Sequence, residues 1–222
     1  LGAGQVLEVP VAGANGVPGD AGGVSLNVTA VSPDGAGFLT VYPCGVDRPL
    51  ASNLNVTAGQ VVPNAVLTGV GAGGKACVFA SVGTDVIVDV NGWLPAGAGF
   101  TQVSPVRVAD TRVGEPVVFP SPKRKLGAGQ VLEVPVAGAN GVPGTAGGAS
   151  LNVTAVTPDG AGFLTVYPCG VDRPLASNLN FTAGQVVPNA VLTGVGTGGK
   201  ACVYSNVGTD VIVDVNGWFP TP

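Results

Sequence analysis

The sequence predicts an all-β protein built as two tandem antiparallel β-sandwich repeats. Three observations support this prediction. The 222 residues include 37 Gly and 19 Pro, which favour turns, and only 10% of residues are charged. Short Val-rich segments recur between those turn residues, and no ten-residue stretch has the spacing of an amphipathic helix. Residues 1–97 also align without gaps on residues 126–222 and differ at 11 of the 97 positions.

The strands expected in the first copy follow one another along the chain, separated by turn residues. In 24–31, "VSLNVTAV", Val, Leu and Ala alternate with Ser, Asn and Thr, which is the period of a half-buried strand. The turn sequence "SPDGAG" then joins this strand to 37–43, "GFLTVYP", as a hairpin. Further strands are expected in 5–11, 75–82, 84–95 and 52–70, the last holding two strands with Pro63 at an edge or bend.

One segment occurs only once. Residues 98–125 separate the two copies, and within them 103–112, "VSPVRVADTR", has the β-branched content of a strand. With this segment a complete unit has seven or eight strands. A two-layer sandwich is the natural architecture for that number, and a small closed barrel is the alternative. Two nearly identical cores therefore share a single segment of this kind.

The four cysteines occupy equivalent positions in the two copies. They lack the close spacing of zinc sites or thioredoxin-like centres, and the chain has no His. We expect one disulfide in each copy, Cys44–Cys77 and Cys169–Cys202, with buried free thiols as the alternative. Closing a loop of 33 residues would stabilise a core by about 3–4 kcal/mol. Paired cysteines are typical of an oxidising compartment.

Composition excludes several classes of function. Without His, the usual general base and the commonest metal ligand are missing, so Ser–His triads and His-based zinc sites are excluded. A net charge of −4 with nine basic residues gives no basic surface for nucleic acid or an anionic membrane. No segment has the apolar length of a membrane span. We therefore expect a non-enzymatic protein with no cofactor, no nucleic-acid partner and no membrane insertion.

Each copy places two carboxylates two alternations apart on one expected strand. Paired acids suggest glycoside hydrolysis, but catalysis is disfavoured because both acids lie on a single strand of a duplicated, apolar module. No metal is expected, and the weak candidates for calcium ligands are Asp85, Asp89, Asn91, Asp210, Asp214 and Asn216. The favoured interpretation is that these acids bond to turns or pair with Arg48 or Arg112.

Aromatic residues near strand ends suggest a second kind of site. Trp93, Trp218, Tyr42 and Tyr167 are candidates for a platform on which a sugar ring stacks. Packing in a core or an interface is the favoured interpretation for side chains of this size. Four Asn-x-Thr sequons lie inside expected strands, so we interpret them as cross-strand hydrogen-bonding positions instead of glycosylation sites.

Three phrases of the chain are informative together: "GVPGDAGGVSLNVTAV", "GFLTVYPCGVDRPLASNLNVTAGQVVPNAV" and "TDVIVDVNGWLP". With "VSPVRVADTR" ahead of them in a full unit, they resemble a tandem-repeat β module of large secreted and cell-surface proteins of actinobacteria and related bacteria. The resemblance implies export and brings no catalytic residues. It also places the "DTR" segment before "LGAGQ". This order implies a complete unit at 99–222 and, at 1–98, a unit that lacks its leading strands.

The unequal copies lead to a hypothesis about assembly. A first unit without its leading strands exposes an unpaired sheet edge, which is a template for another copy of the protein and would give a filament or surface layer. One alternative is a monomer whose edge is covered by a loop or completed by residues 100–112 in a swapped arrangement. Another is a secreted module that binds cell-wall or extracellular polysaccharide.

The basic run Lys123, Arg124 and Lys125 follows "PSP", a loop-like stretch. Exposed basic loops are preferred sites of proteolysis. One hypothesis is that cleavage after the same run further upstream creates Leu1. The alternative is an ordinary solvated loop.

Overall fold

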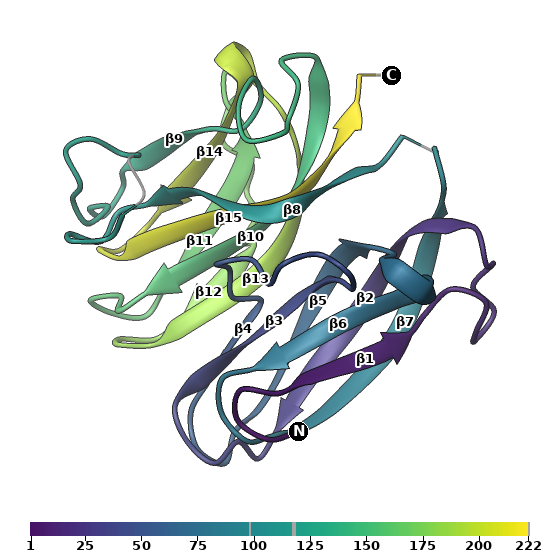
Figure 1. Ribbon diagram of the computed structural model, residues 1–222. Helices are drawn as coiled ribbons and strands as arrows, with labels where there is room; N and C mark the ends of the chain where they lie inside the picture. The colour runs from purple at the N-terminus through teal and green to yellow at the C-terminus, as the bar shows by residue number, and fades with distance from the viewer. Residues whose placement is uncertain (98, 117–118, 222) are drawn as a thin grey trace. The chain divides into compact units, whose positions relative to one another are not determined.

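Figure 1 shows the computed structural model of the chain, which describes residues 1–97, 99–116 and 119–221. The chain divides into two compact units, Leu1–Pro105 and Val106–Pro222. The boundary expected from the sequence, residue 98, lies outside the described residues. Antiparallel strands and two short 3-10 turns form the described secondary structure, which confirms the all-β prediction.

The first unit contains two antiparallel sheets, with strand orders β1-β6-β3-β4 and β5-β2-β7. The strands are β1 Val6–Pro10, β2 Ala21–Val31, β3 Gly37–Pro43, β4 Leu54–Val56, β5 Val61–Gly69, β6 Lys75–Ala80 and β7 Asp85–Pro95. Leu26 from one sheet and Leu39 and Leu54 from the other are fully buried in one hydrophobic core. The unit is therefore a two-layer sandwich, and Pro63 lies in the edge strand β5, where its missing N–H costs no ladder bond.

The second unit repeats this plan with one more strand. Its sheets have the orders β12-β11-β14-β9 and β13-β10-β15-β8. The strands are β8 Thr101–Asp110, β9 Val131–Pro135, β10 Ala146–Val156, β11 Gly162–Pro168, β12 Leu179–Phe181, β13 Val186–Gly194, β14 Lys200–Ser205 and β15 Asp210–Pro220. β8 begins before the division between the units and forms the edge of the second sheet beside β15.

The duplicated strands keep the same register. β2 pairs Leu26 with Val90 of β7, and β10 pairs Leu151 with Val215 of β15. Both ladders shift register at the equivalent place, one residue before these pairs. β7 and β15 therefore differ in their neighbours and not in how they pair with β2 and β10.

Each unit contains one disulfide, Cys44–Cys77 in the first and Cys169–Cys202 in the second. These bridges confirm the predicted pairing and leave no free cysteine. Each bridge ties the end of one strand to the neighbouring strand of the same sheet, β3 to β6 and β11 to β14. Two structural disulfides are typical of a protein from an oxidising compartment. No helix in the described part of the chain has the length and apolar character needed to cross a membrane.

Candidate assembly edge

The second sheet of the first unit ends at β7. Among the described residues, β7 has β2 as its single hydrogen-bonded neighbour, whereas its duplicate β15 lies between β10 and β8 (Figure 1). Residues 84–93 and 209–218 are identical in sequence. The two strands therefore differ in pairing because β8 is present beside one of them.

Contacts in the second unit show which backbone groups of β15 face outward. Thr111 N–H donates to the carbonyl oxygen of Val211 at 3.0 Å, and Val211 N–H donates to Thr111 Oγ1 at 2.9 Å. Peptide groups alternate in direction along an antiparallel strand. In the first unit the duplicate residue Val86, and Val88 after it, consequently direct N–H and C=O groups away from β2. These groups form the row of unused donors and acceptors that marks an open edge.

Two carboxylates, Asp85 and Asp89, lie on the outer face of this edge strand. Both are exposed, and they alternate with Val86 and Val88, whose side chains pack against the core. Neither aspartate forms an ion pair with any other described residue. The open edge therefore combines unused backbone groups with negative charge.

In the second unit the equivalent carboxylates are both bound by the β8 segment. Asp214 accepts hydrogen bonds from Arg107 Nε at 2.9 Å and from Arg107 Nη2 at 3.4 Å. Asp210 accepts a hydrogen bond from Thr111 Oγ1 at 2.7 Å. Arg107 lies on β8, and Thr111 directly follows it. The β8 segment therefore provides β15 with the second row of backbone hydrogen bonds that β7 lacks, and it also provides the partners of both acids.

The Arg107–Asp214 pair is buried, with 14% and 1% of the two side chains exposed. Burial raises the pKa of Asp214 from 3.8 to about 6, although the positive charge of Arg107 opposes this rise. Arg107 Nη1 also lies 3.5 Å from the fully buried carboxylate of Asp110. The guanidinium of Arg107 thus pairs with two buried carboxylates, and its loss would remove a positive charge from beside both of them.

In the "DTR" sequence at the end of β8, the first and last residues bind each other. The carboxylate of Asp110 accepts hydrogen bonds from the backbone N–H, Nε and Nη2 of Arg112 at 3.1, 3.0 and 2.7 Å. Hydrogen bonding to Asp110 raises the pKa of Arg112. The interpretation that paired the strand acids with Arg48 or Arg112 is wrong, because Arg112 binds Asp110 and Arg48 lies 4.1 Å from the centre of the Phe79 ring.

Sequence reasoning does not identify Arg107, although a signal for it exists. Arg107 stands between two valines in an otherwise apolar and β-branched stretch. A charged side chain in such a strand needs an acid on the neighbouring strand. The order of the strands in the sheet determines which acid pairs with Arg107. The local sequence pattern contains no information about that order.

The structure places the candidate calcium ligands on β7 and β15. The described residues contain no group of three or more His, Cys, Asp or Glu side chains that could hold a metal ion. Asn91 is exposed at the register shift of β7, whereas Asn216 is buried in β15, where its amide has no hydrogen-bond partner among the described residues. Asp210 and Asp214 are already engaged by Thr111 and Arg107.

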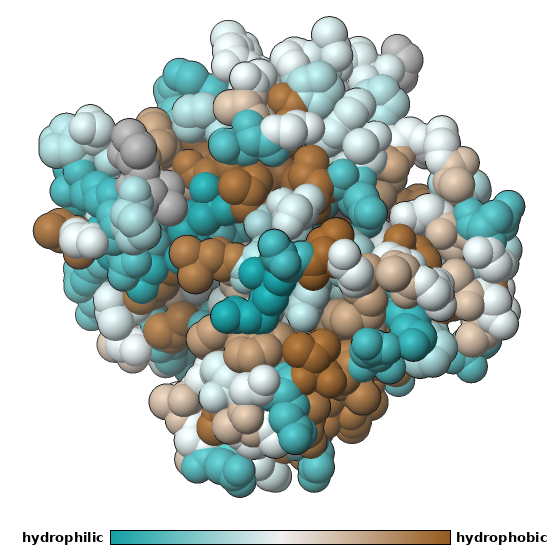
Figure 2. Space-filling view, in the orientation of Figure 1, coloured by the Kyte–Doolittle hydropathy of each residue, from teal (hydrophilic) through white to brown (hydrophobic). Residues whose placement is uncertain are grey.

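Within each unit, the two aromatic candidates lie in different sheets. Tyr42 and Tyr167 are buried beside the disulfides, on β3 and β11. Trp93 and Trp218 lie on β7 and β15, in the opposite sheet of each sandwich. Trp93 is 40% exposed. On the face that Figure 2 shows, hydrophobic areas are interrupted by hydrophilic side chains.

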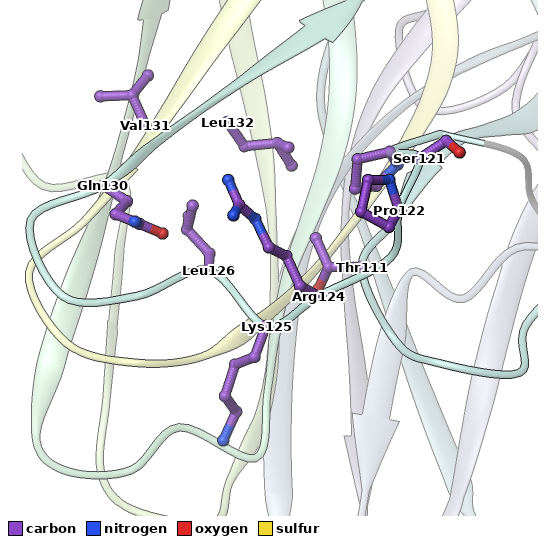
Figure 3. Close-up of a pocket in the computed structure, with 10 residues that line it drawn as sticks. Thr111, Ser121, Pro122, Arg124, Lys125, Leu126, Gln130, Val131 and Leu132 are labelled. Carbon is purple, nitrogen blue, oxygen red and sulfur yellow. The ribbon is translucent and has the colours of Figure 1, made fainter.

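The basic run borders a hollow in the second unit. The hollow has a volume of about 400 Å³ and lies between the connection that follows Thr111 and the start of β9. Arg124 directs its guanidinium toward Leu126 and Leu132 (Figure 3). The side chain of Arg124 is exposed and forms no ion pair with another described residue.

The two lysines of the run are tied to the second unit. Lys123 Nζ donates to the backbone oxygen of Glu115 at 2.7 Å. Lys125 points away from the hollow (Figure 3) and donates to Asp159 Oδ1 at 2.5 Å and to the backbone oxygen of Thr157 at 3.0 Å. Arg124 therefore differs from both lysines, whose side chains are held by hydrogen bonds to other parts of the unit.

Comparison with models of known protein families gave no match to this chain, and a search of curated proteins gave none either. The resemblance to secreted repeat modules stays a prediction. A functional proposal therefore rests on the geometry of the β7 edge and on the contacts of its duplicate.

Proposed function

We propose that this chain is an extracellular structural repeat protein that joins neighbouring molecules by strand addition at β7 and so builds a filament or surface layer. The observation that supports this most is the open edge of β7, whose duplicate β15 has β8 beside it. Open edges pair with extended segments of other chains. Pairing between unlike surfaces does not close on itself, so it produces an open-ended assembly.

The charge on the edge supports pairing between unlike surfaces. Two β7 strands placed side by side would bring Asp85 and Asp89 of one molecule close to the same acids of the other. Like charges on facing strands destabilise a sheet. A closed two-fold dimer through β7 is therefore disfavoured, and a partner strand of different sequence is favoured.

The disulfides support the extracellular part of the proposal. Both pairs of cysteines are oxidised, and the chain retains no free thiol. Such pairs form and persist in oxidising environments. Secretion also agrees with the resemblance to cell-surface repeat modules. A non-enzymatic role is supported because Asp85 and Asp89 lie on one strand, while Asp210 and Asp214 are engaged in structural contacts.

The alternative role as a polysaccharide-binding module has less support. Its expected platform requires exposed rings close together, but Tyr42 and Tyr167 are buried and lie in a different sheet from Trp93 and Trp218.

Light scattering over a range of protein concentrations, combined with electron microscopy, tests the assembly. We expect a 21.6 kDa species when dilute and extended particles of uniform width when concentrated. Ile87→Lys should abolish the particles, because Ile87 is 50% exposed on β7 and a lysine there would discourage edge pairing. The matched control is Val61→Lys, at a 64% exposed site on β5, which should assemble normally. A single 21.6 kDa species at every concentration would contradict the proposal.

A further inference from the structure

The β7 edge has features that specify its partner. We propose that β7 accepts a β8-type strand from a second molecule, and that Asp85 and Asp89 select this strand. A β8-type strand is an extended segment with arginine at the place of Arg107 and Asp-Thr-Arg at its end. This inference rests on the proposed function and names the partner that strand addition requires.

The first argument is that β7 and β15 are the same acceptor. Residues 84–93 and 209–218 are identical, and both strands pair with their inner neighbours in the same register, including the same irregularity. The backbone groups that β15 presents to β8 therefore have counterparts on β7 in the same order. A strand that fits one edge fits the other.

The second argument is that the side-chain partners are also duplicated. Arg107 binds Asp214, and Thr111 binds Asp210. The offset of 125 residues between the copies makes Asp89 the equivalent of Asp214 and Asp85 the equivalent of Asp210. A β8-type strand in the same register on β7 would consequently bring its arginine to Asp89 and its threonine to Asp85.

The third argument compares the number of β8 segments with the number of edges that can accept one. The chain has one β8 segment and two equivalent acceptor edges. Whichever edge holds β8, the other remains open, and in this structure β15 holds it. A β8-type strand on β7 would therefore be a second one, separate from the β8 that β15 holds.

The fourth argument concerns selectivity. A neutral or acidic strand added at β7 would desolvate Asp85 and Asp89 without supplying a positive partner, which is unfavourable. Residues 101–112 contain two arginines and one aspartate, so the segment carries a net charge of +1. The edge thus favours a basic donor and disfavours a second β7.

A synthetic peptide with the sequence of residues 101–112, added to the full chain, tests this inference. We expect binding with 1:1 stoichiometry by calorimetry and new amide protection confined to β7 by hydrogen exchange. Asp89→Asn should weaken binding by about tenfold or more, because a charged hydrogen-bonded pair is lost. Asp85→Asn should weaken it less. The matched control is Asp47→Asn, an exposed acid in a loop of the same unit, which should bind like the wild type.

A second peptide separates pairing from general charge attraction. A peptide carrying Arg107→Gln should bind weakly, and equally weakly to the wild type and to Asp89→Asn, because the two changes remove the same contact. Circular dichroism of the variants checks that each is folded. Equal binding of the original peptide to wild type and Asp89→Asn, or protection away from β7, would overturn the inference.

The result also distinguishes this inference from the proposed function. If particles form but the peptide does not bind, strand selection by Asp85 and Asp89 is wrong while edge assembly stands. If the peptide binds β7 but no particles form at any concentration, the selective edge stands while the filament or surface layer is wrong.

Discussion

At the scale of single residues, one aspartate occupies two different environments in this chain. Asp89 is exposed at an open edge, whereas Asp214 is 1% exposed and is bound by Arg107. The residues around the two acids are identical in sequence. The difference in environment is therefore imposed by a partner that lies more than 100 residues away from Asp214 along the chain.

The pKa of Asp214 gives the second unit a specific pH dependence. Because burial raises this pKa to about 6, the folded unit holds a proton more tightly than the unfolded chain does. Stability should therefore decrease as pH rises from about 4 to about 6, by up to about 3 kcal/mol from this group. Urea unfolding at several pH values, followed by tryptophan fluorescence in Trp93→Phe, measures this trend. In that variant the remaining tryptophan, Trp218, lies in the second unit.

Two variants assign this trend to Asp214. In Asp214→Asn the decrease between about pH 4 and about pH 6 should disappear, because the amide does not titrate. In Asp89→Asn the decrease should persist, because that acid is exposed in the other unit. An identical pH profile in Asp214→Asn and the parent would show that another group controls it.

Removing Arg107 should be strongly destabilising. Arg107→Ala leaves Asp214 buried without its positive partner and weakens the environment of Asp110, which predicts a loss of about 3–5 kcal/mol from the second unit. The matched control is Arg124→Ala, an exposed arginine with no ion pair in the described part of the chain, for which we expect a change within about 0.5 kcal/mol. Equal unfolding free energies for the two variants, measured in urea at neutral pH, would contradict a structural role for the buried pair.

At the scale of elements, the sequence predicts the strands well and the strand order poorly. Alternation and turn residues predict the β2–β3 hairpin, and the position of Pro63 indicates an edge strand. The equivalent spacing of the cysteines predicts both disulfides. These features depend on local chemistry or on loop closure. The acids' partners depend on which strand lies beside β15, and so they are found only in the structure.

The path of the chain after β7 explains why β8 does not fold back on β7 as a hairpin. A Cβ atom on Gly22 would lie 2.8 Å from Ala96, and one on Gly23 would lie 3.1 Å from the ring of Phe100. The side chain of Gln102 occupies the space of a Cβ on Gly69, which is in β5. Ala96 and Phe100 therefore lie against β2, and Gln102 at the start of β8 lies against β5, away from the open edge. This route depends on three glycines that provide space, and no periodic pattern predicts it.

Hydrogen exchange should separate the two identical strands. Amides of β15 have ladders on both sides, whereas those of β7 face solvent on one side, so β7 should exchange faster. Peptic fragments that extend to Leu94 or Phe219 distinguish the copies by mass. Equal protection of Val86 and Val211 would show that β8 exchanges between the two edges in solution.

At the scale of the whole molecule, one β8 segment serves two acceptors. Exchange of β8 between copies fills one edge of the β7 or β15 kind and empties another, so residues 1–222 always keep one such edge open per chain. Strand exchange within a pool of identical molecules consequently never removes the last open edge. An assembly that uses this edge can therefore keep growing, which is a property of filaments and layers and not of closed oligomers.

Limited digestion with trypsin tests whether a β8-type strand can hold two separate chains together. Trypsin should cut first after Arg124, because Arg124 is exposed and has no ion pair with another described residue, while Lys123 and Lys125 are hydrogen-bonded. The cut leaves β8 on one fragment and β15 on the other. We expect the fragments to co-elute on size exclusion in native buffer and to separate in urea, because the β8–β15 ladder and the Arg107–Asp214 pair join them without a covalent bond. The same digestion of Arg107→Ala should release the fragments at lower urea concentration. Fragments of the wild type that separate in native buffer would show that a strand of this kind cannot link one molecule to the next.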